Sequence, residues 1–254
     1  MGNLFGNVAQ DFVKYRKGYP SKFYEKLQEE CGVVFRNQQV LDIATSNGLA
    51  ARDLAALGSY VTGVDNSPEL IEEAIRTNRV EELNIKYFLG DVTNLPVEEK
   101  SFDLITAIHC WNVLPTEQTI SEIYRVLKPG GKFILAQFDP VSIKNSVVTE
   151  TEKIVSKFNT EWSQKSTHGI YPQWINDCYD GGFTNVETFS FDDSIPFSHE
   201  EWKGKMRTDE SIGGSLQDEE VKAFDHALSI LLEEQFDENV LEVPHRMFSV
   251  ICEK

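Results

Sequence analysis

The chain has 254 residues, enough to bury a full core as one elaborated domain or as a domain with a cap. Its formal net charge is −17, and Lys and Arg form no cluster that could neutralise a phosphate backbone, so we expect no nucleic-acid partner. No apolar run approaches the roughly 20 residues that span a bilayer, and the four cysteines lack metal or disulfide spacing. We therefore expect a cytoplasmic protein with reduced thiols, bound to neither membrane nor metal.

Strand-like and helical patterns alternate along the first half of the chain. Apolar runs typical of strands cover 39–43, 60–64, 85–89, 102–108 and 132–138. A helix is predicted to begin with Ser67 as its N-cap and Pro68 as its first residue, and another to begin at Thr116. The turn 128–131 should end that helix and start the fifth strand. This alternation predicts right-handed βαβ units on a parallel sheet, with ligands beyond the carboxyl ends of the strands.

The second half continues the pattern with longer insertions. We predict a helix over 172–179, a strand over 186–191, an acid-led helix from Asp218 and a last strand over 241–252. Three stretches exceed what the sheet needs, namely 1–38, 139–170 and 192–240. The expectation is one domain over 1–254, with a core of 39–138, 171–191 and 241–254. The three insertions are expected to form a cap that closes a substrate chamber.

The stretch 40–65 is the most informative. Its first apolar run ends in Asp42, a loop of small residues opens a helix, and the second apolar run is followed by Asp65. This pattern predicts a nucleoside-binding half-site, in which a carboxylate accepts hydrogen bonds from both ribose hydroxyls. A dinucleotide loop needs glycines where this chain has Ala44, Ser46 and Gly48. A nicotinamide-dependent oxidoreductase and a non-catalytic binding protein of this fold remain the alternatives.

The same stretch resembles motif I of the class I S-adenosylmethionine-dependent methyltransferases, acid-x-G-x-G-x-G. In that family the methionine half of the cofactor crosses the loop, so small residues can replace glycine if φ is not forced positive. The resemblance implies an α/β, Rossmann-like fold with a seven-stranded, mostly parallel sheet. Its antiparallel last strand would be inserted between the two strands before it.

The resemblance also assigns cofactor residues. Asp42 would lie near the methionine ammonium, Asp65 would bind the ribose, and Asp91 would face the adenine amino group. The implied cofactor-binding set is Asp42, Ala44, Thr45, Ser46, Gly48, Asp65, Asn66, Asp91, Val92, His109, Tyr15 and Arg16. The cofactor would be S-adenosyl-L-methionine, with S-adenosyl-L-homocysteine as product and no metal.

The run AIHCWNVLP follows the fourth strand, at the position of motif IV. It lacks the N/D/S-P-P-aromatic signature and the Pro-Cys pair of the enzymes that methylate nucleic acid bases. His109 is expected near the sulfonium, either as a general base or as a group that positions the cofactor. Trp111 is expected either to form a wall of the site or to be a core aromatic.

The N-terminal run FVKYRKGYP resembles the Tyr-x-x-x-Arg-Pro-x-Tyr-Pro opening of relatives of trans-aconitate methyltransferase, with Lys17 where proline is common. This similarity makes Tyr19 a second catalytic candidate. The runs THGIYPQW, SHEEWKGKMR and VPHRMF resemble a bacterial subgroup of small-molecule methyltransferases with the methyltransferase type 11 domain. With Trp111, they supply the substrate candidates His168, Trp202, Arg207 and His245. The expected activity (EC 2.1.1.-) is in-line methyl transfer to an O, N or S atom of a small molecule, by a monomer or homodimer.

Overall fold

The computed structural model describes residues 11, 14–81, 83–162, 168–209, 211–236 and 238–254. The chain forms two compact units, which are described separately. Unit 1 comprises Met1–Lys17, Asp139–Gly169 and Asp192–Arg246, and unit 2 comprises Gly18–Phe138, Ile170–Phe191 and Met247–Lys254. Among the helices of the described residues, none has the length and apolar character needed to cross a membrane.

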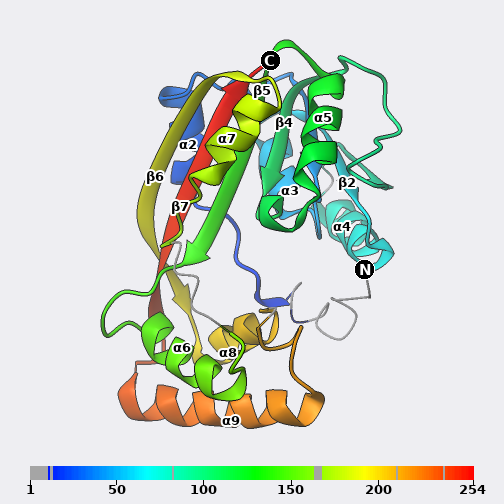
Figure 1. Cartoon of the computed structure of the whole chain (residues 1–254). Coiled ribbons are helices and arrows are strands. Elements are labelled where there is room, and N and C mark those ends of the chain that lie inside the picture. The colour runs from blue at the N-terminus through cyan, green and yellow to red at the C-terminus, as the bar shows by residue number, and fades with distance from the viewer. Residues whose placement is uncertain (1–10, 12–13, 82, 163–167, 210, 237) are drawn as a thin grey trace. The chain divides into compact units, whose positions relative to one another are not determined.

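A seven-stranded sheet organises the fold, with the order β3-β2-β1-β4-β5-β7-β6 (Figure 1). The strands are β1 Gln39–Ile43, β2 Tyr60–Asp65, β3 Ile85–Leu89, β4 Phe102–Ile108, β5 Leu127–Pro140, β6 Thr184–Phe197 and β7 Leu241–Glu253. The first five pair in parallel. β7 is antiparallel to β5: the Gly130 amide donates to the Lys254 carbonyl, whereas Ser249, earlier in β7, donates to the later Leu135 carbonyl. The mostly parallel sheet and its inserted last strand are thus confirmed.

Five helices of the described residues belong to unit 2: α2 Ser21–Glu29, α3 Leu49–Ala56, α4 Pro68–Glu81, α5 Thr116–Val126 and α7 Gln173–Asp180. In Figure 1, α5 and α7 lie in front of the sheet and α2 and α3 lie behind it. The predicted start of α4 is confirmed: Pro68 is its first residue, and the Ser67 hydroxyl accepts from the Leu70 amide at 3.3 Å. Trp111, Phe133 and Trp174 belong to a core cluster that also includes Ile120 of α5 and Cys178 of α7.

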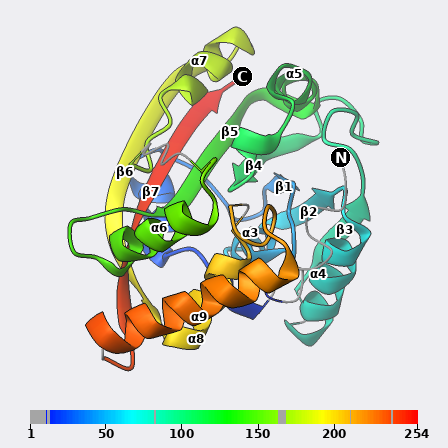
Figure 2. The same ribbon diagram turned by 60° about the horizontal axis from the view of Figure 1, so that its bottom comes forward.

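Unit 1 has its own helices and its own apolar core. α6 Val147–Phe158, α8 His199–Arg207 and α9 Asp218–Gln235 lie side by side (Figure 2). Their core includes Trp202, Phe224 and Leu228. The sequence analysis did not predict the helices α2, α6 and α8. The Ser198-x-x-Glu201 capping box that opens α8 was a readable signal, because each side chain binds the other residue's amide.

The start of the fifth strand was predicted incorrectly. β5 begins at Leu127, directly after α5, and not at Lys132. Leu127 pairs with Phe102 and Lys132 pairs with Leu104, so the residues between them form a bulge within the strand and not a turn before it. Gly130 adopts a φ of 76° in this bulge. Its amide bonds to β7, a partner that local sequence does not reveal.

Candidate functional site

The sheet of unit 2 has a topological switch point between β1 and β4. From β1 the chain continues through β2 to β3 on one side, whereas β4 leads to β5 on the other. The loops that follow β1 and β4 therefore diverge, and ligands of open α/β sheets bind in the crevice that such loops leave. The loop 44–48 and the segment from His109 follow these strands, and Asp65 ends β2 beside them.

Three residues with a Cβ have a left-handed backbone at this edge. Ala44, Ser46 and His109 have φ angles of 47°, 56° and 64°, and Gly48 has 78°. The condition under which small residues replace glycine without strain, a φ that is not forced positive, is therefore not met at Ala44 and Ser46. A left-handed conformation costs a residue with a Cβ about 1–2 kcal/mol. Strain of this kind clusters at functional sites, because the surrounding structure must maintain it.

Glycine at either strained position of this loop should stabilise the protein. For Ala44→Gly and Ser46→Gly, relief of the left-handed strain outweighs the greater freedom of glycine in the unfolded chain. We expect each change to raise the free energy of unfolding by about 0.5–1 kcal/mol, measured by urea denaturation. Ala51→Gly, inside α3, is the matched control and should lower it by about 1 kcal/mol. A loss in the loop variants as large as in this control would contradict the strained geometry.

Asp42 ends the first apolar run and is enclosed. Its side chain is 2% exposed, and the hydroxyls of Thr45 and Thr106 each donate to one of its oxygens at 2.6 Å. Burial raises the pKa of Asp42 to about 6, although the two hydroxyl hydrogen bonds oppose this shift. Sequence reasoning missed Thr106. The signal was present, since it is a polar residue inside an apolar strand, and it pairs with Asp42 in register.

Asp65 joins the loop after β1 to the turn that opens α4. One carboxylate oxygen accepts from the Ser46 amide at 2.8 Å, and the other accepts from the Ser67 amide at 2.9 Å. Burial raises its pKa, and these backbone hydrogen bonds oppose the rise. A carboxylate has about four lone-pair sites, so it retains capacity to accept from a ribose hydroxyl. Asn66 is exposed beside it.

Asp91 lies in the loop after β3 and closes a local turn. One of its oxygens accepts from both the amide and the hydroxyl of Thr93, at 2.8 and 2.7 Å. These hydrogen bonds lower the pKa of Asp91. Asp91 is exposed and Val92 is buried. Their roles at an adenine stay predictions.

The imidazole of His109 is held by the end of β5. Its Nδ1 lies 3.1 Å from the side-chain amide nitrogen of Gln137. Its Nε2 lies 2.6 Å from the Phe138 carbonyl oxygen, and the Phe138 amide donates to the same nitrogen at 3.1 Å. Both ring nitrogens are engaged, so a general base here would first have to release one of these partners. This geometry favours the positioning role of the two roles expected for His109.

Tyr19 contacts His109. The two rings lie 6.1 Å apart with an interplanar angle of 35°. Unit 2 thus brings together the two residues that sequence reasoning proposed for catalysis. Gln137, the partner of His109, was missed. Its only sequence signal is a polar side chain near the end of the apolar fifth strand.

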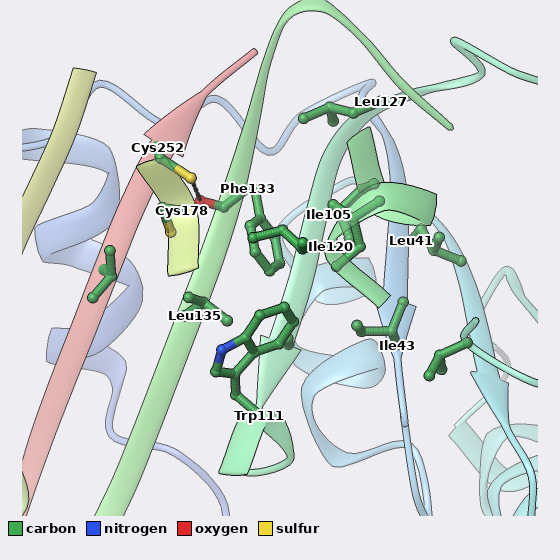
Figure 3. Packing of buried hydrophobic residues seen from close by; sticks show 14 of the residues in the cluster. Leu41, Ile43, Ile105, Trp111, Ile120, Leu127, Phe133, Leu135, Cys178 and Cys252 are labelled. Atoms are coloured by element: carbon green, nitrogen blue, oxygen red, sulfur yellow. Dashed lines mark hydrogen bonds between the residues drawn. The ribbon is translucent and has the colours of Figure 1, made fainter. Parts of the chain in front are cut away.

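The two tryptophans proposed for the substrate site are core residues. Trp111 is 2% exposed, its Nε1 donates to Asp177 at 2.8 Å and its ring packs against Phe133 (Figure 3). Trp202 is 1% exposed, and its Nε1 donates to the Thr151 hydroxyl at 3.0 Å. For Trp111 this burial favours the core aromatic of the two expected roles, and a substrate role for Trp202 stays a prediction.

Tyr15, Arg16 and Arg207 belong to unit 1. The Tyr15 hydroxyl donates to Glu200 at 3.3 Å, and Arg16 is half-buried in the same segment. The guanidinium of Arg207 forms ion pairs with Asp11 and Asp225 at 2.5 and 2.6 Å. These contacts give Tyr15 and Arg207 structural roles that the sequence patterns did not suggest.

The two histidines of the substrate set have different surroundings. His168 is exposed, and its carbonyl accepts from Arg246 at 3.0 Å. His245 is 4% exposed, its Nδ1 lies 2.9 Å from the Val243 carbonyl and its ring stacks on Phe197. Burial lowers the pKa of His245 to about 4, so its imidazole is neutral at neutral pH. Among the described residues, no group of three or more His, Cys, Asp or Glu side chains could hold a metal ion.

The fold is that of the Rossmann-like methyltransferases. Residues 41–135 match the family model described as a methyltransferase domain. Demethylmenaquinone methyltransferase of Tropheryma whipplei is 35% identical over 107 residues, which are 41% of this chain and 44% of that protein. Ubiquinone biosynthesis O-methyltransferase of Coxiella burnetii is 33% identical over 105 residues, 41% of this chain and 45% of that protein. The chain thus spans less than half the length of these curated relatives.

A solved structure extends the likeness of the fold beyond the matched domain. Phosphoethanolamine N-methyltransferase 2 of Haemonchus contortus, in complex with S-adenosyl-L-methionine, superposes with a TM-score of 0.57. The alignment covers 99% of this chain and 57% of that chain at 19% sequence identity. At this identity the comparison supports the architecture alone.

Proposed function

We propose that this protein is an S-adenosyl-L-methionine-dependent methyltransferase (EC 2.1.1.-) that acts on an O, N or S atom of a small molecule. The observation that carries the proposal is the switch-point edge of unit 2, where the buried Asp65 carboxylate adjoins the loop 44–48. The names of the two curated relatives support it, because both are methyltransferases of quinone biosynthesis. Neither a nicotinamide oxidoreductase nor a non-catalytic binder has comparable support.

The residues of this edge fit the two ends of such a cofactor. Asp65 would accept from the ribose hydroxyls, and the loop amides would border the methionine half. Asp42 is too enclosed for more than an edge contact, so its negative charge would act on the ammonium across a short distance. The bound cofactor supplies an activated sulfonium, and the protein's task is to position the acceptor in line and to exclude water.

We assign recognition of the acceptor to unit 1. Its inserted segments 139–170 and 192–240 are far longer than the connections that a sheet needs, and such insertions are usually functional. His168 and His245 stay substrate candidates there, and a neutral His245 can accept or donate a hydrogen bond without adding charge. We also propose a reducing, cytoplasmic location, in which the thiols of the four buried cysteines would stay reduced.

The test of the cofactor site is calorimetry with S-adenosyl-L-homocysteine. We expect Asp65→Ala to weaken binding by about 10- to 100-fold, because hydrogen bonds from two ribose hydroxyls to a carboxylate are lost. Glu72→Ala removes an exposed acid on α4 and should leave the affinity unchanged. Urea unfolding of each variant checks that the fold survives. Absence of wild-type binding at millimolar ligand would refute the proposal, and fluorescence titration with NADH would then test the nicotinamide alternative.

A further inference from the structure

The loop 44–48 of the candidate site lies against one aromatic side chain of unit 2. Tyr87 is in β3 and pairs in register with Gly63 of β2. A Cβ on Gly63 would lie 2.7 Å from Cδ1 of Tyr87 and 3.0 Å from Cγ2 of Thr45. The Tyr87 ring therefore occupies the space that a side chain at position 63 would need, next to Thr45 of the loop.

The hydroxyl of Tyr87 reaches the other end of the loop. Gly48 is the N-cap of α3 and has a φ of 78°. A Cβ on Gly48 would lie 2.4 Å from the hydroxyl oxygen of Tyr87 and 3.1 Å from Nη1 of Arg52. Glycine at positions 48 and 63 thus leaves room for one tyrosine, which spans the loop from Thr45 to Gly48.

This hydroxyl is buried at a cost to stability. Among the described residues it has no partner in hydrogen-bonding geometry. Burial raises the pKa of Tyr87 to about 12, although the nearby guanidinium of Arg52 opposes the rise. A buried hydroxyl without a partner destabilises a fold, and a phenylalanine would fill most of the same space without this cost. The close approach to Gly48 is what a phenylalanine would lack.

Arg52 fixes the middle of the same loop. Its Nη1 donates to the Asn47 carbonyl oxygen at 2.7 Å, and its Nε lies 3.3 Å from a carboxylate oxygen of Glu81 in α4. The Arg52 side chain is 11% exposed and Asn47 is buried, so water competes little for this hydrogen bond. Because Arg52 lies in the first turn of α3, it ties the loop to the helix that the loop opens.

The loop needs such support because its backbone is strained. Ala44 and Ser46 have left-handed φ angles of 47° and 56°. A residue with a Cβ keeps such a conformation only where the surrounding structure over-determines it. Asp65 accepts from the Ser46 amide, and Tyr87 and Arg52 adjoin the two residues that follow. Loss of either side chain should let the loop relax into unstrained conformations.

We propose that Tyr87 and Arg52 are positioning residues, which maintain the strained loop 44–48 in the conformation that binds the cofactor. This inference rests on the proposed function for its ligand, whereas the contacts that define it all lie within unit 2. Both residues act through the loop and not by contact with the ligand. They keep the binding conformation populated before the ligand arrives.

Tyr87→Phe separates positioning from packing. The urea midpoint should be no lower than that of the wild type, because the unpartnered hydroxyl is removed. Amide hydrogen exchange over residues 45–48 should be faster. Calorimetry with S-adenosyl-L-homocysteine should show binding weakened about fivefold, the factor for a loop that is competent about a fifth of the time. A role in packing alone would move stability and affinity in the same direction.

Arg52→Met is the second variant. It keeps the apolar stem of the side chain and removes the donor to the Asn47 carbonyl. Exchange over residues 45–48 should again be faster, and the affinity should fall about fivefold, as for the loss of one hydrogen bond. Arg52→Lys should recover part of this affinity, because its ammonium can also donate to the Asn47 carbonyl.

Two matched controls make the same kinds of change elsewhere in unit 2. Tyr24→Phe removes a buried hydroxyl that does have a partner, Asp53 at 2.9 Å, so it should lower the stability. It should leave exchange over residues 45–48 and the affinity unchanged. Arg79→Met removes an exposed cation of α4 and should also change neither measurement.

The exchange and affinity measurements test separate steps of this proposal. Unchanged exchange over residues 45–48 in Tyr87→Phe or in Arg52→Met would overturn the role of that residue. Faster exchange with unaltered affinity would overturn the link between the loop and the ligand. Failure of the wild type to bind S-adenosyl-L-homocysteine would instead refute the proposed function, and exchange would still decide whether Tyr87 and Arg52 hold the loop.

Discussion

Asp42→Asn should make the protein more stable at pH 8 by about 3 kcal/mol, while it weakens the binding of S-adenosyl-L-homocysteine. The stabilisation arises because Asp42 is 2% exposed and carries its charge at a cost. An asparagine has the same shape. Its carbonyl can accept from one threonine hydroxyl, and its amide can donate to the other. The affinity should fall because the substitution removes the negative charge that we propose acts on the cofactor's ammonium.

The pH dependence has a definite sign. The pKa of Asp42 is raised in the folded protein to about 6, above its ordinary value of 3.8, so the folded state holds this proton at pH values where the unfolded state has released it. Asp42 therefore lowers stability progressively as the pH rises between these two values, and the full deficit persists above them. The advantage of Asp42→Asn should shrink to about half at pH 5 and vanish where Asp42 is protonated in both states.

Urea denaturation of the wild type and Asp42→Asn at pH 5 and pH 8 measures this difference. Asp103→Asn is a matched control with the opposite sign. Although partial burial opposes it, hydrogen bonds from Lys128 and the Gln39 amide hold the pKa of Asp103 below its ordinary value. Asp103→Asn should therefore lower the stability at pH 8. A stability gain in Asp42→Asn that does not change with pH would show that the carboxylate is not the cause.

Trp111→Ala should lower the free energy of unfolding by about 3–5 kcal/mol. The ring is buried, packs against Phe133 in the core between the sheet and α5 and α7, and binds Asp177 through its indole nitrogen. Removal leaves a cavity and an unpartnered carboxylate oxygen on α7. Urea denaturation measures this change in the free energy of unfolding. Without urea, the affinity for S-adenosyl-L-homocysteine should be unchanged.

Trp111→Phe separates the two contributions. It retains most of the apolar ring but loses the hydrogen bond to Asp177, so the loss should be about 1–2 kcal/mol. If Trp111 instead formed a wall of the substrate site, both variants would alter acceptor kinetics with only small changes in stability. That outcome would contradict the placement of Trp111 in the core.

Asp42 and the strained loop 44–48 both lower the stability of the folded protein, and both lie at the same edge of the sheet. Burial of the Asp42 carboxylate and the left-handed backbone at Ala44 and Ser46 both oppose folding. Both also lie where the proposed cofactor would bind. The variants that we expect to stabilise the protein are therefore those that alter the proposed site, as in other proteins where function limits stability.

Local sequence determined much of this fold. Apolar runs located the first four strands, and the Ser67-Pro68 pair located the start of α4. These features depend on neighbours along the chain. The alternation of strands and helices fixed the parallel sheet by handedness. Asp42 and Asp65 lie near the carboxyl ends of two adjacent parallel strands, so they had to lie at the same edge of the sheet.

Tertiary structure decided what those local rules leave open. The positive φ of Ala44 and Ser46 follows from closing the loop against Asp65, and the burial of Trp111 follows from the position of α7. Similarly, the contacts of Tyr15 with Glu200 and Gly204 could not be read from the sequence. Each of these outcomes depends on residues distant in the chain, and a single sequence carries no direct record of such contacts. The residue types at the site could thus be read from the sequence, whereas their geometry and partners came only from the fold.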